Sequence, residues 1–132
     1  MSIDITLRPV RLGDLELMLA WRSDPEIYRH FREQDGPLEW KNHVEWFVNR
    51  SPDRQDHIIE YNGRHVGSVN IDEEDHVGVY IGEKSLCGEG IATRAVQELC
   101  GKLDSDEFYA EIHTDNESSQ RLFEKCGFKL LC

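Results

Sequence analysis

Apolar residues follow two rhythms along this 132-residue chain, one typical of strands and one typical of helices. Short apolar runs bounded by turn residues predict strands, over 5–10, 57–61, 65–71, 76–82, 107–113 and 128–132. Apolar residues at helical spacing predict helices, over 14–24, 35–52, 91–103 and 114–127. The resulting order is β-α-α-β-β-β-α-β-α-β, an α/β chain of the mixed α+β kind. Its length fits one domain over residues 1–132.

Turn and cap residues mark where these elements begin and end. Asp14 is expected to cap the first helix and Asp24-Pro25 to stop it, and Pro37 is expected in the first turn of the second. Asn62-Gly63 between two strand patterns predicts a tight hairpin. Gly127 is expected at the C′ position that ends the last helix. The apolar faces expected of the first two helices are Leu17, Met18 and Trp21, and then Trp40, Val44, Phe47 and Val48.

The charge balance restricts the partners that this chain can attract. A net charge of −11 argues against binding to nucleic acid or to an anionic membrane. The acidic residues either solvate the surface or attract cationic partners such as amines. An acidic surface with ten arginines and only five lysines would also suit a high-salt habitat. With no apolar run of membrane-spanning length and no leader pattern, we expect a cytoplasmic protein. The four cysteines form no C-x-x-C pair and the six histidines no i,i+4 pair, so we expect reduced thiols and no metal site.

The segment SLCGEGIATRAVQEL, residues 85–99, joins a predicted strand to a predicted helix through two glycines. The unpaired amides of a helix's first turn and the helix dipole attract anions, and glycines let a phosphate approach the backbone. The segment lacks the third glycine of the dinucleotide-binding pattern and the Gly-Lys-Ser/Thr of a P-loop. By itself it is therefore either a phosphate-binding loop or only a tight connection.

Two motifs resemble those of the GNAT superfamily of acetyl-CoA-dependent N-acetyltransferases. The first is the family's R/Q-x-x-G-x-G/A loop, which matches residues 87–92 and is followed by Thr93. The second is N-x-x-S-x-x-L-[Y/F]-E-K-x-G-F, met by Asn116, Ser119, Leu122, Phe123, Glu124, Lys125, Gly127 and Phe128. The resemblance covers nearly the whole chain and implies a mixed, mostly antiparallel sheet flanked by helices. The opening LRPVRLGDLELMLAWRSDPEI and HVEWF are similar to amino-sugar and ribosomal-protein N-terminal acetyltransferases. Four aromatic residues in and between these segments either pack the helices or contact substrate, namely Trp21, Trp40, Trp46 and Phe47.

The resemblance also implies where acetyl-CoA would bind. Backbone amides of the loop would hold the pyrophosphate, and the pantetheine arm would lie beside the strand at 79–81 like an added strand. An amide near Tyr80 or Ile81 would bond the acetyl carbonyl and later its oxyanion. Asn116 would bond the pantetheine or the acceptor side of the cleft, or it is a helix cap, or both. The implied cofactor-binding residues are Val79, Tyr80, Ile81, Cys87, Gly88, Glu89, Gly90, Ile91, Ala92, Thr93, Asn116 and Ser119.

Glu111 is the candidate catalytic base. Acetyl transfer needs a neutral amine, so a carboxylate must take the amine proton directly or through water. Glu111 lies five residues before Asn116, as the catalytic glutamate does in the ribosomal-protein acetyltransferases that the chain resembles. Strand alternation would place it on one face with His113. The alternative is a glutamate that only faces solvent.

The chain departs from the family pattern at three places. Cys87 stands where the family prefers Arg or Gln, although its main-chain amide could still serve. Phe123 replaces a tyrosine often proposed as the general acid, and phenylalanine cannot donate a proton. The sequence given ends at Cys132, where the family usually adds a seventh strand, so either the sheet is short, or a partner chain or a truncation explains the absence.

We therefore interpret the sequence as an N-acetyltransferase that moves acetyl from acetyl-CoA to a primary amine. The amine belongs to a small molecule such as an amino sugar or to a protein N-terminus. The alternative is a CoA-binding or regulatory domain of the same fold with little catalysis, which Phe123 and the missing strand favour. A homodimer is compatible with either reading, and the sequence leaves the acceptor open.

Overall fold

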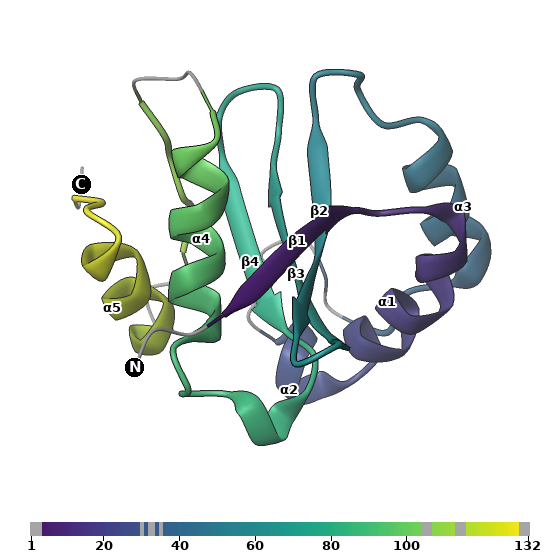
Figure 1. Cartoon of the computed structure of the whole chain (residues 1–132). Helices are drawn as coiled ribbons and strands as arrows, with labels where there is room; N and C mark the ends of the chain where they lie inside the picture. The colour runs from purple at the N-terminus through teal and green to yellow at the C-terminus, as the bar shows by residue number, and fades with distance from the viewer. Residues whose placement is uncertain are drawn as a thin grey trace.

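Four antiparallel strands form the centre of the structure. It is a computed structural model that describes residues 4–29, 31, 34, 36–103, 107–112 and 116–129. The strands are β1 (Ile5–Pro9), β2 (Gln55–Tyr61), β3 (Arg64–Ile71) and β4 (Val77–Ile81), and they lie in this order across the sheet. Each strand is antiparallel to the next, so the expected meander is confirmed (Figure 1).

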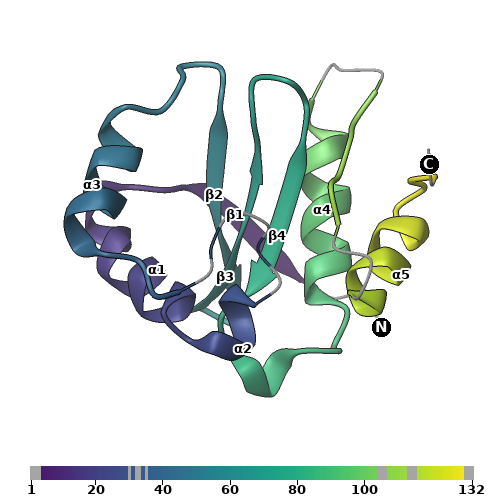
Figure 2. The same cartoon turned by 180° about the vertical axis from the view of Figure 1, so that it is seen from behind.

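Helices cover both faces of this sheet (Figures 1 and 2). One face carries α1 (Leu15–Arg22), α2 (Pro25–Tyr28) and α3 (Trp40–Val48). The other carries α4 (Ile91–Gly101) and α5 (Glu117–Lys125). Two short 3₁₀ turns, at Leu12–Asp14 and Lys84–Leu86, precede α1 and α4. The expected mixed α/β fold is confirmed.

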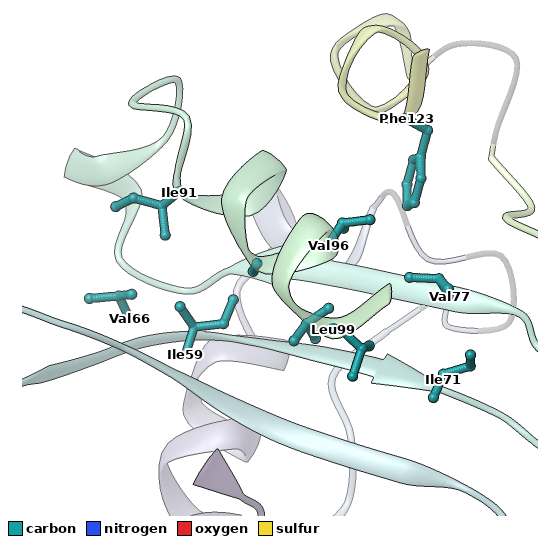
Figure 3. Packing of buried hydrophobic residues seen from close by; sticks show 10 residues of the cluster. Ile59, Val66, Ile71, Val77, Ile91, Val96, Leu99 and Phe123 are labelled. Carbon is teal, nitrogen blue, oxygen red and sulfur yellow. The ribbon is translucent and has the colours of Figure 1, made fainter. Parts of the chain in front are cut away.

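The two faces hold separate apolar cores. Ile58 and Ile59 are neighbours on β2, both fully buried, and they point to opposite faces, as strand geometry requires. Figure 3 shows the core beneath α4 and α5, in which Ile59 meets Leu99 of α4 and Phe123 of α5 lies near Val96. The core beneath α1 to α3 contains Val10, Leu15, Met18, Trp21, Ile27 and Ile58.

The β2–β3 hairpin turns where Asn62-Gly63 predicts it, with φ angles of 51° and 76° at these two residues. Both values belong to the primed hairpin turn. The strand that follows contains an irregularity that alternation does not predict. Ile59 pairs with Gly67 and Glu60 with His65, which leaves Val66 without a partner position in the register. This bulge puts Val66 on the same core face as Val69.

The first helices differ from their predicted form. The carboxylate of Asp14 makes no cap at α1; it accepts two 2.9 Å bonds from the Arg8 guanidinium and one from the Arg11 amide. Leu15 replaces Leu17 on the buried face, because Leu17 is 36% exposed. Pro25, expected only to stop the first helix, is instead the first residue of α2.

The second predicted helix begins later than expected. It starts at Trp40, so Pro37 lies outside it, and its one buried residue is His43. Trp40 and Val48 are exposed, while Val44 and Phe47 pack at the edge of the core. The predicted apolar face was therefore half wrong, because the face that packs against the core is centred on His43, Val44 and Phe47 and leaves out Trp40 and Val48.

The strand predicted at 107–113 is not formed over its described part, 107–112. Only an isolated parallel bridge joins Tyr109 to His76, through the bonds from Val77 N to Tyr109 O (2.7 Å) and from Tyr109 N to Asp75 O (2.9 Å). Within the final predicted strand, 128 and 129 have no strand structure, and 130–132 lie outside the described residues, as does His113. Among the described helices, none is long and apolar enough to span a membrane.

Candidate active site

A cleft of about 890 Å³ lies along the outer edge of β4. The loop before α4 and the first turn of that helix form one wall. Glu111, Ile112 and the first turns of α5 continue it, and Arg22 and Phe31 line the cleft on the α1 side of the sheet. The cleft therefore gathers residues from segments that are far apart in the sequence, including most of the predicted cofactor-binding residues.

The glycine loop places backbone amides at the mouth of this cleft. Gly88 and Gly90 have φ angles of 83° and 84°, a left-handed conformation that glycine adopts without strain. No atom lies within 4 Å of the position that a Gly88 Cβ would take, so the backbone there is open to a ligand. Among the described residues, the amides of residues 88 and 90–93 have no hydrogen-bond partner. With the positive end of the α4 dipole, these amides form an anion-binding site.

Two other amides of the loop are already used within it. Cys87 N donates to Lys84 O at 3.2 Å, and Glu89 N donates to Leu86 O at 3.3 Å. Cys87 lines the cleft and is exposed, and partial desolvation of its sulfur raises the pKa of the thiol. Glu89 is exposed and does not line the cleft. The amide of Cys87, expected to serve the cofactor, thus has another acceptor.

The outer edge of β4 presents alternate amides to the cleft. Val77 N donates outward to Tyr109, and Gly82 N donates inward to Val66 on β3. Since amides alternate along a strand, those of Val79 and Ile81 point outward and that of Tyr80 points toward β3. The edge is available because the segment at 107–112 pairs with β4 only at its start.

Asn116 caps α5 at the cleft. Its Oδ1 accepts from the Ser119 amide at 3.2 Å and from the Ser118 hydroxyl at 3.3 Å. The cap reading is therefore confirmed, and the side-chain NH₂ is the group left to donate to a ligand. Ser119 also lines the cleft.

Phe123 holds the other end of α5 in place. Its carbonyl accepts from Phe128 N at 2.9 Å, and Gly127 N donates to Glu124 O at 3.0 Å, with Gly127 at a φ of 93°. This is the helix-ending motif that Gly127 predicts. The Phe123 ring meets the Phe128 ring edge to face at 4.9 Å and is 5% exposed, so it serves as a packing residue.

Glu111 lines the cleft with its side chain 53% exposed. Its Oε1 lies 3.8 Å from Nε2 of His76, whose Nδ1 lies 3.4 Å from Asp72. A carboxylate at this position can take a proton from a group in the cleft. His76 is a neighbour that sequence reasoning missed, because only the bridge to Tyr109 brings the two together.

The charge of the cleft is opposite to that of the whole chain. Among the described residues, six of the chain's 15 lysines and arginines line it, against two of its 26 acidic residues. The six are Arg22, Arg29, Arg54, Lys84, Arg121 and Lys125. The cleft therefore suits a polyanionic ligand within a protein of net charge −11.

Sequence reasoning also missed a polar group on the α1 side of the cleft. Tyr80 points to the α1 face, where its ring meets Trp21 at 6.1 Å and Phe31 at 5.4 Å between centroids. Its buried hydroxyl has no partner within the described part of the chain, and burial raises its pKa. Arg22 lies beside it, with a buried Nε that also has no partner there. Nothing in the local sequence pattern around either residue signals this arrangement.

Comparisons with known proteins agree with this geometry. A family model described as an acetyltransferase (GNAT) domain matches residues 4–129. An uncharacterized protein of Methanocaldococcus jannaschii is 38% identical over 136 residues, which cover 95% of this chain but 28% of that relative. The chain thus spans less than a third of the length of the curated relative it matches. Figure 2 shows the side of the fold on which β4 and the 107–112 segment lie.

Solved structures share the fold. A crystal structure of a domain from Methanocaldococcus jannaschii is 36% identical, with a TM-score of 0.88 over 98% of this chain and 91% of that one. Spermidine N-acetyltransferase from Vibrio cholerae, solved with CoA and spermine, has a TM-score of 0.84 at 20% identity, over 97% and 82% of the two chains. That second likeness is one of fold. A cleft with an amide cradle and an open strand edge, together with a family match over residues 4–129, establishes that the chain belongs to the GNAT acetyltransferase domain family.

Proposed function

We propose that this protein transfers the acetyl group of acetyl-CoA to a primary amine. The observation that carries the proposal is the row of unpartnered amides at residues 88 and 90–93, which opens into a cation-lined cleft. The cations and amides match the phosphates of CoA, and the Gly88 backbone has the space that a close phosphate needs. The residues present therefore fit acetyl-CoA.

The neighbouring residues would hold the rest of this cosubstrate. The outward amides of Val79 and Ile81 are the donors available to an extended arm and to a carbonyl oxygen. The NH₂ of Asn116 is a further donor from the opposite wall. When bound, acetyl-CoA supplies an acetyl group on a thioester, whose thiolate is a tolerable leaving group.

Glu111 would remove the proton of the acceptor amine, because it is the carboxylate on the wall beside the open edge of β4. Phe123 cannot serve as an acid, so the leaving thiolate takes its proton from water or leaves unassisted. The interpretation as an amino-sugar or protein N-terminal acetyltransferase rests on the opening segment, since the solved V. cholerae relative is named for spermidine. A cytoplasmic location and a homodimer remain predictions.

Calorimetric titration with acetyl-CoA tests the cradle. Gly88→Leu should weaken binding at least about tenfold, because its side chain would occupy the open space that the phosphates need. Gly63→Leu is the matched control: Gly63 also has a positive φ, 76°, and no atom within 4 Å of its Cβ position, but it does not line the cleft. Undetectable binding by the folded wild-type protein would refute the proposal.

Turnover tests the chemistry. Thiol release from acetyl-CoA is followed with a panel of amines, namely spermidine, glucosamine and a short peptide. Glu111→Gln should lower kcat about a hundredfold or more and leave the affinity for acetyl-CoA unchanged. Glu124→Gln, an exposed glutamate of α5 outside the cleft, is the matched control. Tight binding without turnover on any amine would support the CoA-binding domain instead.

A further inference from the structure

Arg22 lines the cleft on the α1 side of the sheet, the face opposite to α4, and its charge has no ion-pair partner among the described residues. It is the last residue of α1, and its guanidinium lies over the Phe31 ring, with Cζ 4.9 Å from the centroid. Nε is buried without a partner, and no ion pair or hydrogen bond of the side chain exists among the described residues. Desolvation lowers the pKa of this guanidinium, so its surroundings disfavour the charge that it carries.

Arg54, another arginine that lines the cleft, is neutralised. Arg54 donates to both carboxylate oxygens of Asp56 at 2.9 and 3.1 Å, and Arg50 shares one of them at 2.9 Å. Arg54 and Asp56 lie near enough to Arg22 to influence its charged state electrostatically. Arg22 in turn acts on His43 in the same way. Asp56 is already shared by two guanidinium groups, so it does not neutralise a third. This side of the cleft therefore holds excess positive charge.

The Tyr80 hydroxyl adds a second polar group at the same place that has no partner in the described part of the chain. Tyr80 lies between Val79 and Ile81, whose side chains pack toward α4 on the opposite face of the sheet. The cleft thus passes from the cradle at α4, across the open edge of β4, to Arg22 and Phe31. A molecule held at Arg22 would reach that edge from the side opposite to the cofactor cradle.

We propose that Arg22 binds an anionic oxygen group, a carboxylate or a phosphate, on the acceptor amine, with the Tyr80 hydroxyl as a second donor. The inference rests on the proposed function and deepens it: the acceptor is an amine that also carries an anion. A guanidinium edge receives either group through two parallel hydrogen bonds. A polycation with no anion would meet uncompensated positive charge there.

Anion titration followed by NMR tests the site directly. The Nε–Hε signal of Arg22 is observed in CoA-saturated protein, with its cradle filled, while inorganic phosphate and then acetate are added. We expect a saturable shift at Arg22 and smaller shifts at Arg50 and Arg54, whose Nε groups already donate to Phe47 O and to Asp56. No saturable shift at Arg22, or equal shifts at all three, would overturn the inference. Failure to bind CoA at all would count against the proposed function itself, and the inference would fall with it.

Variants and matched acceptors test the role in substrate choice. Arg22→Met keeps the apolar stem on Phe31 and should weaken phosphate binding about tenfold or more, with CoA affinity unchanged. Arg22→Lys should recover only part of it, because a lysine lacks the planar fork. Glucosamine 6-phosphate is compared with glucosamine, and 5-aminopentanoate with 1,5-diaminopentane. Equal or faster acetylation of glucosamine and 1,5-diaminopentane, the members without an anionic group, unchanged by Arg22→Met, would refute the inference. Comparing the sugar pair with the aminopentane pair identifies whether a phosphate or a carboxylate is preferred. If none of the four amines is acetylated, the NMR titration alone decides whether Arg22 binds an anion.

Discussion

Removing the hydroxyl of Tyr80 should make the protein more stable. The ring is held by Trp21 and Phe31, and phenylalanine would keep both contacts. The hydroxyl is buried and has no partner among the described residues, so folding strips it of water without replacing the lost hydrogen bonds. An unsatisfied buried polar group of this kind costs about 1–3 kcal/mol. Tyr80→Phe should raise the free energy of unfolding by that amount.

Urea denaturation followed by tryptophan fluorescence measures this difference. Each kcal/mol corresponds to roughly 4 °C in Tm for a domain of this size, so thermal melting gives a second measurement. The advantage of the variant should also widen above about pH 10. Burial raises the pKa of Tyr80 in the folded state, so alkali ionises the tyrosine first in the unfolded wild-type chain and stabilises that state.

Tyr109→Phe is the matched control. The Tyr109 hydroxyl is exposed and donates to Glu107 at 2.7 Å, so its removal should change stability by less than about 1 kcal/mol, in the destabilising direction. A Tyr80→Phe variant that is less stable than wild type would show that the hydroxyl is hydrogen-bonded in solution. The reasoning about an unsatisfied polar side of the cleft would then be wrong.

Two further perturbations test the packing and the electrostatics of the α1 face. Gly82→Ala should lower the free energy of unfolding by about 1–3 kcal/mol in thermal melts, because the new Cβ would lie 2.2 Å from Cγ of Trp21. Gly101→Ala is the control: it lies in the last turn of α4 with open space around it and should be neutral or stabilising. If both variants changed stability equally, the clash with Trp21 would be contradicted. The hydrogen bond from Arg8 holds the pKa of Asp14 below its ordinary value. The ionised Asp14 therefore stabilises the folded protein fully above the unfolded pKa near 3.8, and this stabilisation is lost as the pH falls through the lower folded pKa. The gap in urea midpoint between wild type and Asp14→Asn should therefore close below about pH 4, and a gap independent of pH would exclude this ion pair as its cause.

Elements of the fold with a local cause were predictable from the sequence. Asn62-Gly63 and Gly127 need left-handed backbone, and both turns form where these residues occur. The bulge at Val66 was not predictable, because it depends on how β3 meets two other strands. Pro25 was misinterpreted for a different reason: a proline that ends one helix is equally suited to begin the next, and the Asp24 carboxylate accepts from Glu26 N at 3.0 Å to cap it.

The same distinction applies to the site. The glycine loop and the Asn116 cap are contiguous motifs, so the cradle could be anticipated from the sequence. Arg22 and Tyr80 come from a helix end and a strand far apart in the chain, and each has an ordinary pattern around it. Their significance comes from the hydrogen-bond partners that both lack among the described residues, and only the packed structure gives that information.

The open edge of β4 has a consequence for the protein before any ligand binds. An unpaired strand edge is a template on which any extended chain can add, including another copy of the same protein. Here the Tyr109 bridge closes the edge at one end, and the cleft walls leave the remainder accessible to something thin and extended. The feature that would accept an extended cofactor arm is thus also the place where strands of two molecules could join. Ligand-free protein should self-associate more readily than protein saturated with acetyl-CoA, so the occupied cleft would keep the molecule monodisperse.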